Sequence, residues 1–461
     1  MENQSKYIIL KQTSFRIILY SLPSIITFFI YLIGYYPGQM NIDSFEQWEQ
    51  MITHNYNDWH PLFHTLFNQL ITDILGRNPA AIAIVQILMI TLVFGYGLYC
   101  LEKIGVKKSL LWFFSAAFAL YPAGGILSIC LWKDIPYTAS ILLLTICTIN
   151  IVFTNGEWLN SKLHILILIL ASLGTLFFRH NGILSFAAVF ILLPILFRNH
   201  FKKIGYMFLI IAACYVIIKF PIYRAFHIEP TQSSEAMGIP LNITAGIIKN
   251  DGYITDYQRE VLNSFYPIEQ WKKQYNPYCI NPIKFDSKYL NMPLLLSSKK
   301  KFFTIWLQLM KQNPKLALEA YGKQTSVLWQ LTNPSNGSVY IMNNGIQDNK
   351  FGLKNIELVP QISKLCYSIY DFTRSSNVIW FFWRPALHIY LSLIILVMLI
   401  IKIGFKSIII IAPVMMNLAG LIVAIPAQDF RYLYCNVLAT FLFIPLILFM
   451  YNKNFKNEPR K

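Results

Sequence analysis

Residues 80–101 read AAIAIVQILMITLVFGYGLYCL and contain no charged side chain. A helix that crosses a bilayer needs about 20 mostly apolar residues, so this stretch predicts a membrane-spanning helix. The composition of the whole chain agrees, since 55% of its 461 residues are hydrophobic and 13% are charged. Ordinary globular chains carry about 25% charged residues. The composition therefore excludes a disordered, collagen-like or simple cytosolic protein and predicts an all-α polytopic membrane protein.

The same length criterion identifies ten candidate spans. They cover residues 15–36, 80–101, 110–129, 135–153, 163–178, 183–197, 204–221, 379–401, 405–426 and 433–451. The fifth and sixth are short, and Arg179, His180 and Asn181 separate them, as in a helical hairpin that meets water at its tip. The first follows basic residues, as a signal peptide does. Its apolar run is too long, however, and no small-residue cleavage site follows, which predicts an uncleaved anchor.

What the net charge of +17 indicates about function depends on where the 39 Lys and Arg residues lie. With the N-terminus inside, the short cytoplasmic segments hold 16 of them and the short outside segments hold four. Those four are Arg77, Lys133, Arg179 and Arg431. Basic residues in short loops stay in the cytoplasm, so we expect a multi-pass protein of the cell membrane with both termini cytoplasmic. Most of the excess charge is thus a topology signal and does not indicate nucleic-acid binding.

The remaining basic residues lie mainly in or beside one long segment that follows the seventh span. The sequence thus predicts a seven-helix membrane module at 1–221, an outside or interfacial segment at 222–378 and a three-helix membrane module at 379–461. Cys279 and Cys366 share the middle segment, and whether they form a disulfide stays open at this point. Lys outnumbers Arg 29 to 10, and Ile and Asn are abundant, a composition typical of AT-rich bacterial coding.

The first outside loop, about 37–79, is too long for a simple link between two spans. It is acidic in a basic protein, and its apolar residues recur at helical spacing. These are Phe45, Trp48 and Met51, followed by Leu62, Phe63, Leu66, Phe67 and Leu70. The pattern predicts two amphipathic helices that lie at the membrane interface with aromatic anchors.

Ionisable side chains at the ends of membrane spans are costly and often functional. Asp43 follows the first span in YPGQMNIDSFEQW. It suits a general base or a metal ligand at the membrane surface. The alternative is a helix N-cap, because Asp43 precedes a helical stretch with Glu46 three residues on.

His60 and His64 lie four residues apart in DWHPLFHTLF. That spacing can hold a metal, but Pro61 and the aromatic residues favour a structural turn followed by packing. Asp134 in LWKDIPYT stands beside Lys133 where the fourth span begins. An active-site role and an N-cap role are equally compatible with its position.

Arg179 in FFRHNG and Arg431 in AQDFRYLY lie at the outer ends of later spans. The planar guanidinium group is suited to bind phosphate. The alternative is an ion pair that ties helix ends together, which Asp429 supplies for Arg431. Under the predicted topology, Asp43, Asp134 and the two arginines face the same side. A reaction there needs a carboxylate to activate an acceptor and cations to hold a lipid phosphate leaving group.

This arrangement resembles the C-type glycosyltransferase (GT-C) superfamily, which includes protein O-mannosyltransferases and aminoarabinose transferases. More narrowly, it is similar to an uncharacterised bacterial branch of polytopic proteins. The resemblance rests on Asp43 in NIDSFEQW, His60-Pro61 in WHPLFHTL, Asp134 in LWKD, Arg179 in RHNG and Arg431 in DFRYLY. The family carries an acidic catalytic residue in the first outside loop, uses polyprenyl-phosphate sugars as donors, and has seven shared helices followed by a variable part.

The resemblance implies an inverting sugar transfer from a polyprenyl-phosphate donor to an envelope glycan, lipid or protein at the outer face. Asp43 and Asp134 are then expected to be catalytic. Substrate binding is expected at His60, Lys133, Arg179, Asn181, Asp429, Arg431 and Tyr432. Many relatives carry a paired acidic motif, whereas Asp43 has no adjacent acid. Glu46 is the second candidate for the catalytic base in this loop. No metal ligand is therefore predicted, and a divalent cation is left open.

Two other classes of function compete with this interpretation. A transporter or flippase of a lipid-linked glycan predicts charged residues near mid-span and broken helices that face each other. The centres of these spans are nearly free of charge, which disfavours ion-coupled transport. A non-enzymatic envelope scaffold built around 222–378 predicts that Asp43, Asp134 and Arg179 are dispensable.

Overall fold

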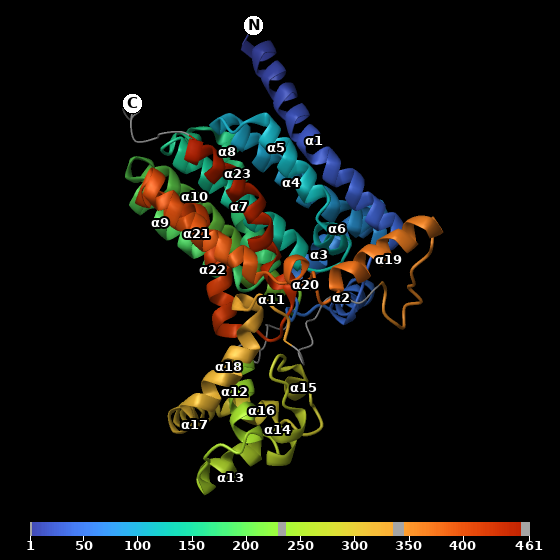
Figure 1. Cartoon of the computed structure of the whole chain (residues 1–461), viewed down its shortest axis with the longest axis vertical. Coiled ribbons are helices and arrows are strands. Elements are labelled where there is room, and N and C mark those ends of the chain that lie inside the picture. Colours follow the sequence, from blue (N-terminus) through green and yellow to red (C-terminus); the bar gives the residue numbers. More distant parts are fainter. Residues whose placement is uncertain (1, 229–236, 335–344, 453–461) are drawn as a thin grey trace.

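The computed structural model describes residues 2–228, 237–334 and 345–452, and within these ranges the chain is helical, with isolated β-bridges in place of named strands (Figure 1). The fold has a body of membrane helices and a smaller outer subdomain at one end of it. The chain leaves the body after α11, forms the outer subdomain with α12 to α18, and returns through α19. The start of α1 and the end of α23 lie at the end of the body opposite the outer subdomain.

The helical body contains the following elements. Its first part comprises α1 (Glu2–Gly34), α2 (Ile42–Thr53), α3 (Leu62–Leu75), α4 (Pro79–Ile104), α5 (Lys108–Ala119), α6 (Pro122–Ser128), α7 (Asp134–Phe153), α8 (Lys162–Phe178), α9 (Gly182–Leu196), α10 (Phe201–Ile217) and α11 (Tyr223–Ala225). Its second part comprises α19 (Pro360–Arg374), α20 (Ile379–Phe382), α21 (Ala386–Ile403), α22 (Ile408–Ala424) and α23 (Tyr434–Asn452). A π-helical turn, Ile218–Ile222, joins α10 to α11.

Seven helical segments are long and apolar enough to cross a membrane in the part of the chain that the structure describes. They are Gln12–Gly34, Pro79–Ile104, Asp134–Phe153, Arg198–Ala225, Ala386–Ile403, Phe405–Ala424 and Phe430–Tyr451. These coincide with seven of the ten predicted spans, so the prediction of a polytopic helical membrane protein is confirmed. The count of ten is not confirmed.

The predicted span 110–129 is broken into α5 and α6, which meet at an angle of 59°. The break has a local cause: Pro122 is the first residue of α6, and a proline disfavours helical geometry in the residue before it. That residue, Tyr121, is extended, with φ −77° and ψ 107°. The predicted spans 163–178 and 183–197 form α8 and α9, which have 17 and 15 residues. Both are shorter than a typical span, and they pack against each other as the predicted hairpin.

The turn between α8 and α9 depends on a glycine. A β-carbon at Gly182 would overlap the carbonyl oxygen of Thr175, so only glycine lets the two helices approach this closely. The turn thereby places Arg179 and Asn181 against α7 and α22, which both pack on this hairpin.

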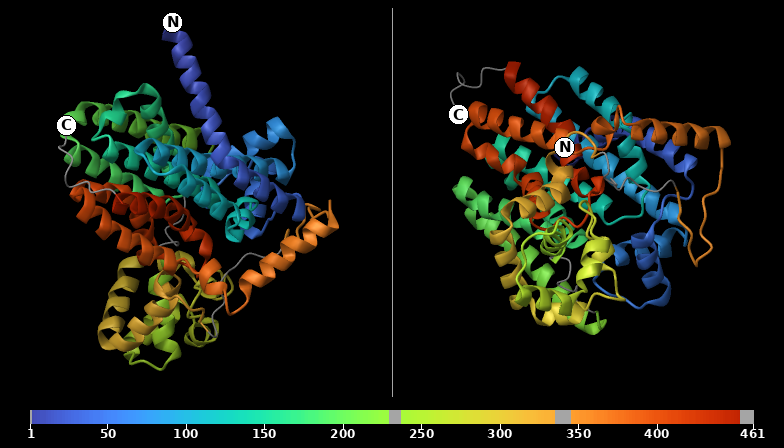
Figure 2. Two further views of the ribbon diagram at one scale, coloured as in Figure 1. Left: turned by 45° about the horizontal axis from the view of Figure 1, so that its top comes forward. Right: turned by 60° about the horizontal axis from the view of Figure 1, so that its bottom comes forward.

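Helix α7 lies at the centre of the body, with 89% of its most apolar window buried. It packs against α4, α8, α22 and α23 (Figure 2). The two predicted amphipathic helices of the first outside loop are present as α2 and α3. Their aromatic residues do not all anchor in lipid, however, because Trp48 is buried in the protein core, as is the neighbouring Met51.

The outer subdomain contains α12 (Gly238–Lys249), α13 (Asp256–Phe265), α14 (Ile268–Gln274), α15 (Asn281–Lys284), α16 (Met292–Ser297), α17 (Lys299–Gln312) and α18 (Pro314–Trp329). It has a hydrophobic core of its own around the fully buried Trp271, and that core continues into α22 through Leu418 and Leu421. The predicted middle segment 222–378 is therefore two structures, because α19 packs on α1 in the helical body and not in the outer subdomain.

The two cysteines of that segment are separated for the same reason. Cys279 pairs with Ala427 in an isolated β-bridge, whereas Cys366 of α19 lies against Gly34 of α1. All seven cysteines of the chain are thiols outside any disulfide; Cys214 is half-buried and the other six are buried.

Alkylation of the denatured, unreduced protein should therefore modify all seven thiols, as counted by intact mass spectrometry. The reduced protein, alkylated in the same way, is the control. A mass that corresponds to five modified thiols would contradict this arrangement of the middle segment.

Candidate functional site: a charged cluster at one end of the helical body

Four motifs that are far apart in the sequence meet at the end of the body that faces the outer subdomain. They are the motifs of Asp43, Asp134, Arg179 and Arg431. The chains that lead into Asp43 and Asp134 run side by side, joined by a parallel bridge between Gln39 and Cys130. Ser44 Oγ donates to the carbonyl of Leu131 at 2.9 Å, which fixes the start of α2 against the turn before α7. The segments that carry Asp43 and Asp134 are thus held together by contacts that involve no charged side chain.

The guanidinium of Arg431 is at the centre of the cluster. Its Nη1 donates to Asp43 Oδ2 at 2.8 Å. Its Nε lies 2.9 Å from Asp429 Oδ2 and 3.9 Å from Asp134 Oδ2. The same group stacks over the ring of Trp132 at 4.3 Å from the ring centroid. One cation thereby joins the first outside loop, the start of α7 and the start of α23.

A second ion pair lies beside it, between Arg179 Nη1 and Asp134 Oδ1 at 2.5 Å. The Arg179 guanidinium also lies over the rings of Tyr432 and Tyr137, 5.0 and 5.6 Å from their centroids. Asp134 is 1% exposed, whereas Arg179 is 12% exposed, so the carboxylate is internal and the guanidinium reaches the surface of the cluster.

The N-cap alternatives for both aspartates are wrong. The N-cap of α2 is Asn41, whose side chain accepts a hydrogen bond from the Ser44 N–H, and Asp43 lies inside the helix with its carboxylate on Arg431. Asp134 is the first residue of α7 and pairs with Arg179. The ion-pair alternative for Asp429 is correct, because it binds both the side chain and the backbone N–H of Arg431.

A hydrogen-bonded chain runs from Lys133 through His60 to Glu46. Lys133 Nζ lies 2.6 Å from His60 Nδ1, and His60 Nε2 lies 3.1 Å from Glu46 Oε2. Burial and the neighbouring Lys133 lower the pKa of His60, so the imidazole is neutral near pH 7. A neutral ring that accepts from lysine at Nδ1 donates its Nε2–H to the glutamate.

The predicted alternative of a metal between His60 and His64 has no support in the geometry. The ring nitrogens of His64 contact the side chains of Gln47 and Asn68, at 3.0 and 3.4 Å. In the described ranges, no group of three or more His, Cys, Asp and Glu side chains is placed to hold a metal ion.

The carboxylates of the cluster do not fit a divalent cation either. Each of Asp43, Asp134 and Asp429 has an arginine nitrogen within 2.9 Å, so a metal ion would have to displace a guanidinium from each oxygen set. Three cations, Lys133 and the two arginines, already face these three carboxylates.

The cluster drives the pKa values of two carboxyl groups in opposite directions. Burial alone would raise the pKa of Asp43, but the charges of Arg431 and Lys133 outweigh it and hold the pKa well below its ordinary value. Burial dominates at Asp429 and raises its pKa to about 6, although Arg431 opposes the shift. Separated pKa values in neighbouring acids are typical of sites that handle protons.

Access to the cluster differs between its members. The Asp43 side chain is 29% exposed, against 11% for Asp429 and 1% for Asp134. Arg431 is 11% exposed. A ligand that approaches from outside therefore meets Asp43 and the edges of the two guanidinium groups first, while Asp134 lies behind them.

Asn181, another predicted binding residue, lies behind Arg179. Its amide donates to Asn417 Oδ1 at 3.4 Å, and the hydroxyl of Tyr137 donates to the same oxygen at 3.1 Å. Asn417 in turn donates to the backbone carbonyl of Tyr432 at 3.0 Å. Sequence reasoning missed Asn417, although a lone asparagine in the apolar helix α22 is a signal of the kind that identified the other residues.

Sequence reasoning also missed the residues that hold the connector 425–429, the segment between α22 and Arg431. Arg384 is fully buried and donates from Nη2 to the carbonyl of Ser326, from Nε to that of Gln330, and from Nη1 to Gln428 Oε1. Two of these acceptors are carbonyls at the C-terminus of α18, where a cation is favoured by the helix dipole. Gln324 of α18 also donates to the carbonyl of Ile425 at 2.8 Å.

The outer subdomain thus positions Asp429 and Arg431, because α18 holds the backbone that leads into them. A backbone hydrogen bond from Ile280 N to the carbonyl of Pro426, at 3.0 Å, fixes the connector from another part of the same subdomain.

Asp134→Ala should lower the stability of the folded protein by about 3–5 kcal/mol, because it leaves the Arg179 guanidinium partly buried without its carboxylate partner. Thermal unfolding of the purified protein in detergent measures the change. Asp251→Ala is the matched control, since the Asp251–Lys272 pair in the outer subdomain is exposed and an exposed ion pair contributes little to stability. Equal unfolding temperatures for the two variants would contradict the structural importance of the internal pair.

A comparison with known proteins identifies the family to which the chain belongs. No curated protein and no solved structure matches the chain. A family profile matches residues 51–461, a range that includes every residue of the charged cluster except Asp43 and Glu46. The chain therefore belongs to the family of unknown function DUF6020.

Proposed function

We propose that the protein is a membrane glycosyltransferase that moves a sugar from a polyprenyl-phosphate donor to an envelope acceptor at the outer face of the cell membrane. One observation carries the proposal: an accessible carboxylate, Asp43, and two guanidinium groups lie within one cluster at the ends of membrane helices. The resemblance of the motifs to the GT-C superfamily supports the same reaction. The excess of basic residues in the other set of loops supports an outward-facing cluster.

The proposed step is a single displacement at the anomeric carbon. The acceptor oxygen attacks this carbon from the side opposite the phosphate and forms the new glycosidic bond. The bond between the anomeric carbon and the phosphate oxygen breaks, and its electron pair leaves with the polyprenyl phosphate. The acceptor proton passes to Asp43, so charge and atoms balance and the anomeric centre is inverted.

Arg431 and Arg179 would bind the phosphate, whose negative charge grows as this bond breaks. Both are suitable because a guanidinium donates two parallel hydrogen bonds to phosphate oxygens. Asp134 and Asp429 hold the two arginines in place through contacts of 2.5 and 2.9 Å. Their role in this scheme is to position the arginines.

The low pKa of Asp43 has a consequence for the mechanism. A carboxylate held in its ionised form by Arg431 is a weak base, because a good general base has a pKa near the working pH. Arrival of the donor phosphate at Arg431 would compete with Asp43 for the same N–H groups and weaken that contact. The pKa of Asp43 would then rise, so that donor binding itself activates the base.

A flippase or transporter of a lipid-linked glycan is less compatible with the arrangement. The charged residues of the cluster lie at helix ends or in turns, at Lys133–Asp134, Arg179 and Asp429–Arg431. Ion-coupled transport ordinarily requires such residues near the middle of the spans.

Asp43→Asn should abolish transfer while the protein still folds, because it removes the proton acceptor and keeps the shape of the side chain. We expect a loss of about 10²–10⁴-fold in rate, the usual contribution of a general base. The measurement compares envelope glycans and lipid-linked sugar pools from cells with the gene, cells without it, and cells that carry the variant. Asp251→Asn in the outer subdomain is the control and should behave as wild type. Retained transfer by Asp43→Asn at normal protein levels would rule out the base assignment.

Lowering the pH from 7 to 5 should strengthen donor binding. A pKa of about 6 means that Asp429 takes up a proton in this interval, which removes one negative charge from Arg431 and leaves its guanidinium more available to phosphate. The phosphodiester donor stays ionised throughout, so the change belongs to the protein. The KM for the donor identified in the cellular comparison should fall toward pH 5, and Asp429→Asn should show the low KM at both pH values. A donor KM that is independent of pH in the wild type would disprove this role of Asp429.

A further inference from the structure

An apolar groove of about 500 Å³ lies where the outer subdomain meets the outer end of α22. The residues that form its walls come from α12, α17, α18 and α22. They include Ile243, Trp306, Met310, Leu318, Tyr321 and Val423. No titratable acid, lysine or arginine is among the residues that line it, so the groove is suited to a hydrocarbon chain.

The groove is continuous with a membrane-spanning helix. Ile422 and Val423 form one wall and belong to the candidate span Phe405–Ala424. Val423 is 72% exposed and Leu318, on the facing helix α18, is 71% exposed. The hydroxyl of Tyr321 donates to the carbonyl of Ile422 at 3.0 Å and fixes the two walls together. Large apolar side chains this exposed at the end of a span are expected to contact lipid and not water.

The groove is separate from the charged cluster. Asn417 faces the cluster from α22, where it bonds Asn181 and the backbone of Tyr432. Ile422 and Val423 follow it by five and six residues, which places them about 140° and 240° around the helix. The two groove residues therefore lie on the side of α22 opposite the cluster, and an occupant of the groove would not be the group that contacts Arg431.

Two lysines are next in sequence to residues that line the groove. Lys311 follows Met310 at the end of α17, and Lys315 follows Pro314 at the start of α18. Both are exposed. By contrast, Lys323 one turn beyond the groove pairs with Glu319 at 2.6 Å, so its charge is compensated. Exposed lysines adjacent to residues of an apolar groove are suited to the phosphate of an anionic phospholipid.

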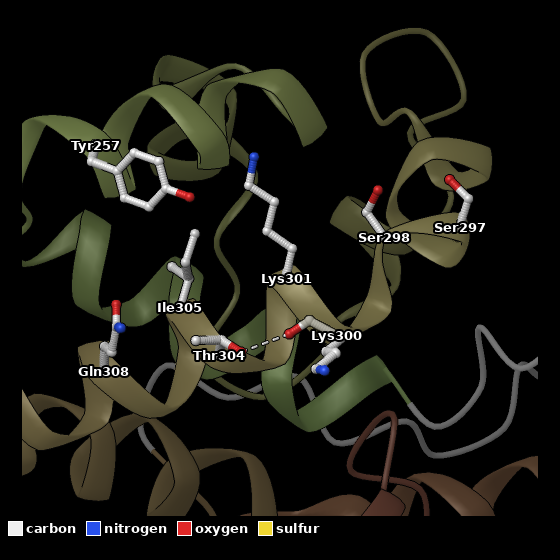
Figure 3. A pocket seen from close by; sticks show the side chains of 8 residues that line it. All are labelled: Tyr257, Ser297, Ser298, Lys300, Lys301, Thr304, Ile305 and Gln308. Atoms are coloured by element: carbon white, nitrogen blue, oxygen red, sulfur yellow. Dashed lines mark hydrogen bonds between the residues drawn. The ribbon is translucent and has the colours of Figure 1, made fainter.

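The opposite face of α17 has a different character. A second hollow of about 430 Å³ lies there, and its lining is polar, with Tyr257, Lys301, Thr304 and Gln308 (Figure 3). Thr304 and Gln308 each stand two residues from Trp306, or about 200° around the helix. Helix α17 therefore presents an apolar face to the groove and a polar face to the surroundings, as a helix on a membrane surface does.

We propose that the groove binds an acyl chain of an anionic phospholipid from the surrounding leaflet, with the phosphate near Lys311 and Lys315, and that this lipid docks the outer subdomain onto the bilayer. The bound chain would lie between α18 and α22. Because α18 also holds the connector 425–429 through Gln324, the lipid would support the backbone that carries Arg431. This binding site does not depend on the reaction proposed for the charged cluster.

Fluorescence quenching tests the position of the groove in the bilayer. The purified full-length protein is placed in nanodiscs of phosphatidylglycerol, either plain or brominated on the acyl chains. The contribution of Trp306 is the difference in quenching between the wild type and Trp306→Phe. We expect Trp306 to be quenched by the brominated lipid, and Leu318→Asp to reduce that quenching at least twofold. Leu318→Phe, which fills the groove without adding charge, should do the same.

Leu365→Asp on α19 is the matched control, because Leu365 is 53% exposed and lies outside the groove. It should leave the Trp306 signal unchanged. Gel filtration and thermal unfolding establish that each variant is folded. Absence of quenching at Trp306 in the wild type, or quenching in both Leu318 variants that is as strong as in the wild type, would overturn the proposal.

The choice of headgroup is tested separately by mass spectrometry of lipids retained by the protein from mixed phosphatidylglycerol and phosphatidylcholine. The wild type should retain phosphatidylglycerol preferentially. The double variant Lys311→Gln, Lys315→Gln should lose about fivefold of that preference per lysine, the factor that corresponds to about 1 kcal/mol each. Equal retention of the two lipids by the wild type would refute an anionic occupant.

Discussion

The rest of the structure depends on the ion pairs that the guanidinium of Arg431 makes with three aspartates. It joins Asp43 in the first outside loop to Asp429 and Asp134, and so connects three segments that are far apart in the chain. A buried cation is tolerated only where carboxylates and hydrogen bonds compensate its loss of water. The carboxylates that compensate Arg431 lie at the start of α2, at the start of α7 and in the connector before α23. The membrane helices that carry these segments are therefore held in one arrangement at the ends that face the charged cluster.

The outer subdomain contributes to the same cluster without supplying a charged residue to it. Its α18 accepts hydrogen bonds from the fully buried Arg384, which also binds Gln428, the residue before Asp429. A second contact, from Ile280 to Pro426, fixes the other end of the connector. The subdomain is thus a support for the charged cluster as well as a separate folding unit with its own core.

Sequence reasoning located the helices and the polar motifs, because hydrocarbon makes charge costly and each charged residue beside a span is conspicuous. It placed Asp43 and Asp134 correctly at the ends of helices and left open whether they cap those helices. The capping alternatives were wrong because Asn41 is the N-cap of α2, and because arginines from residues 179 and 431 reach the carboxylates. Such partners are set by helix packing, which hydropathy does not encode. The bend at Pro122 was missed because the proline ends a helix within a continuous apolar run. The support from Arg384 was missed because all of its partners are neutral acceptors, which no charge pattern in the sequence reveals.

The position of Arg431 in the chain has a consequence for biogenesis. Membrane helices are inserted in the order of synthesis, so Asp43, Asp134 and Arg179 are in place at the ends of their helices before the connector and α23 exist. An early nascent chain can form the pair between Asp134 and Arg179, but it lacks the cation that restrains Asp43. The cluster becomes complete only after synthesis has passed residue 431 and the outer subdomain has folded around the connector. A partly made chain thus carries Asp43 with only one of the two arginines proposed to bind phosphate, so the proposed site stays incomplete until Arg431 has been synthesised.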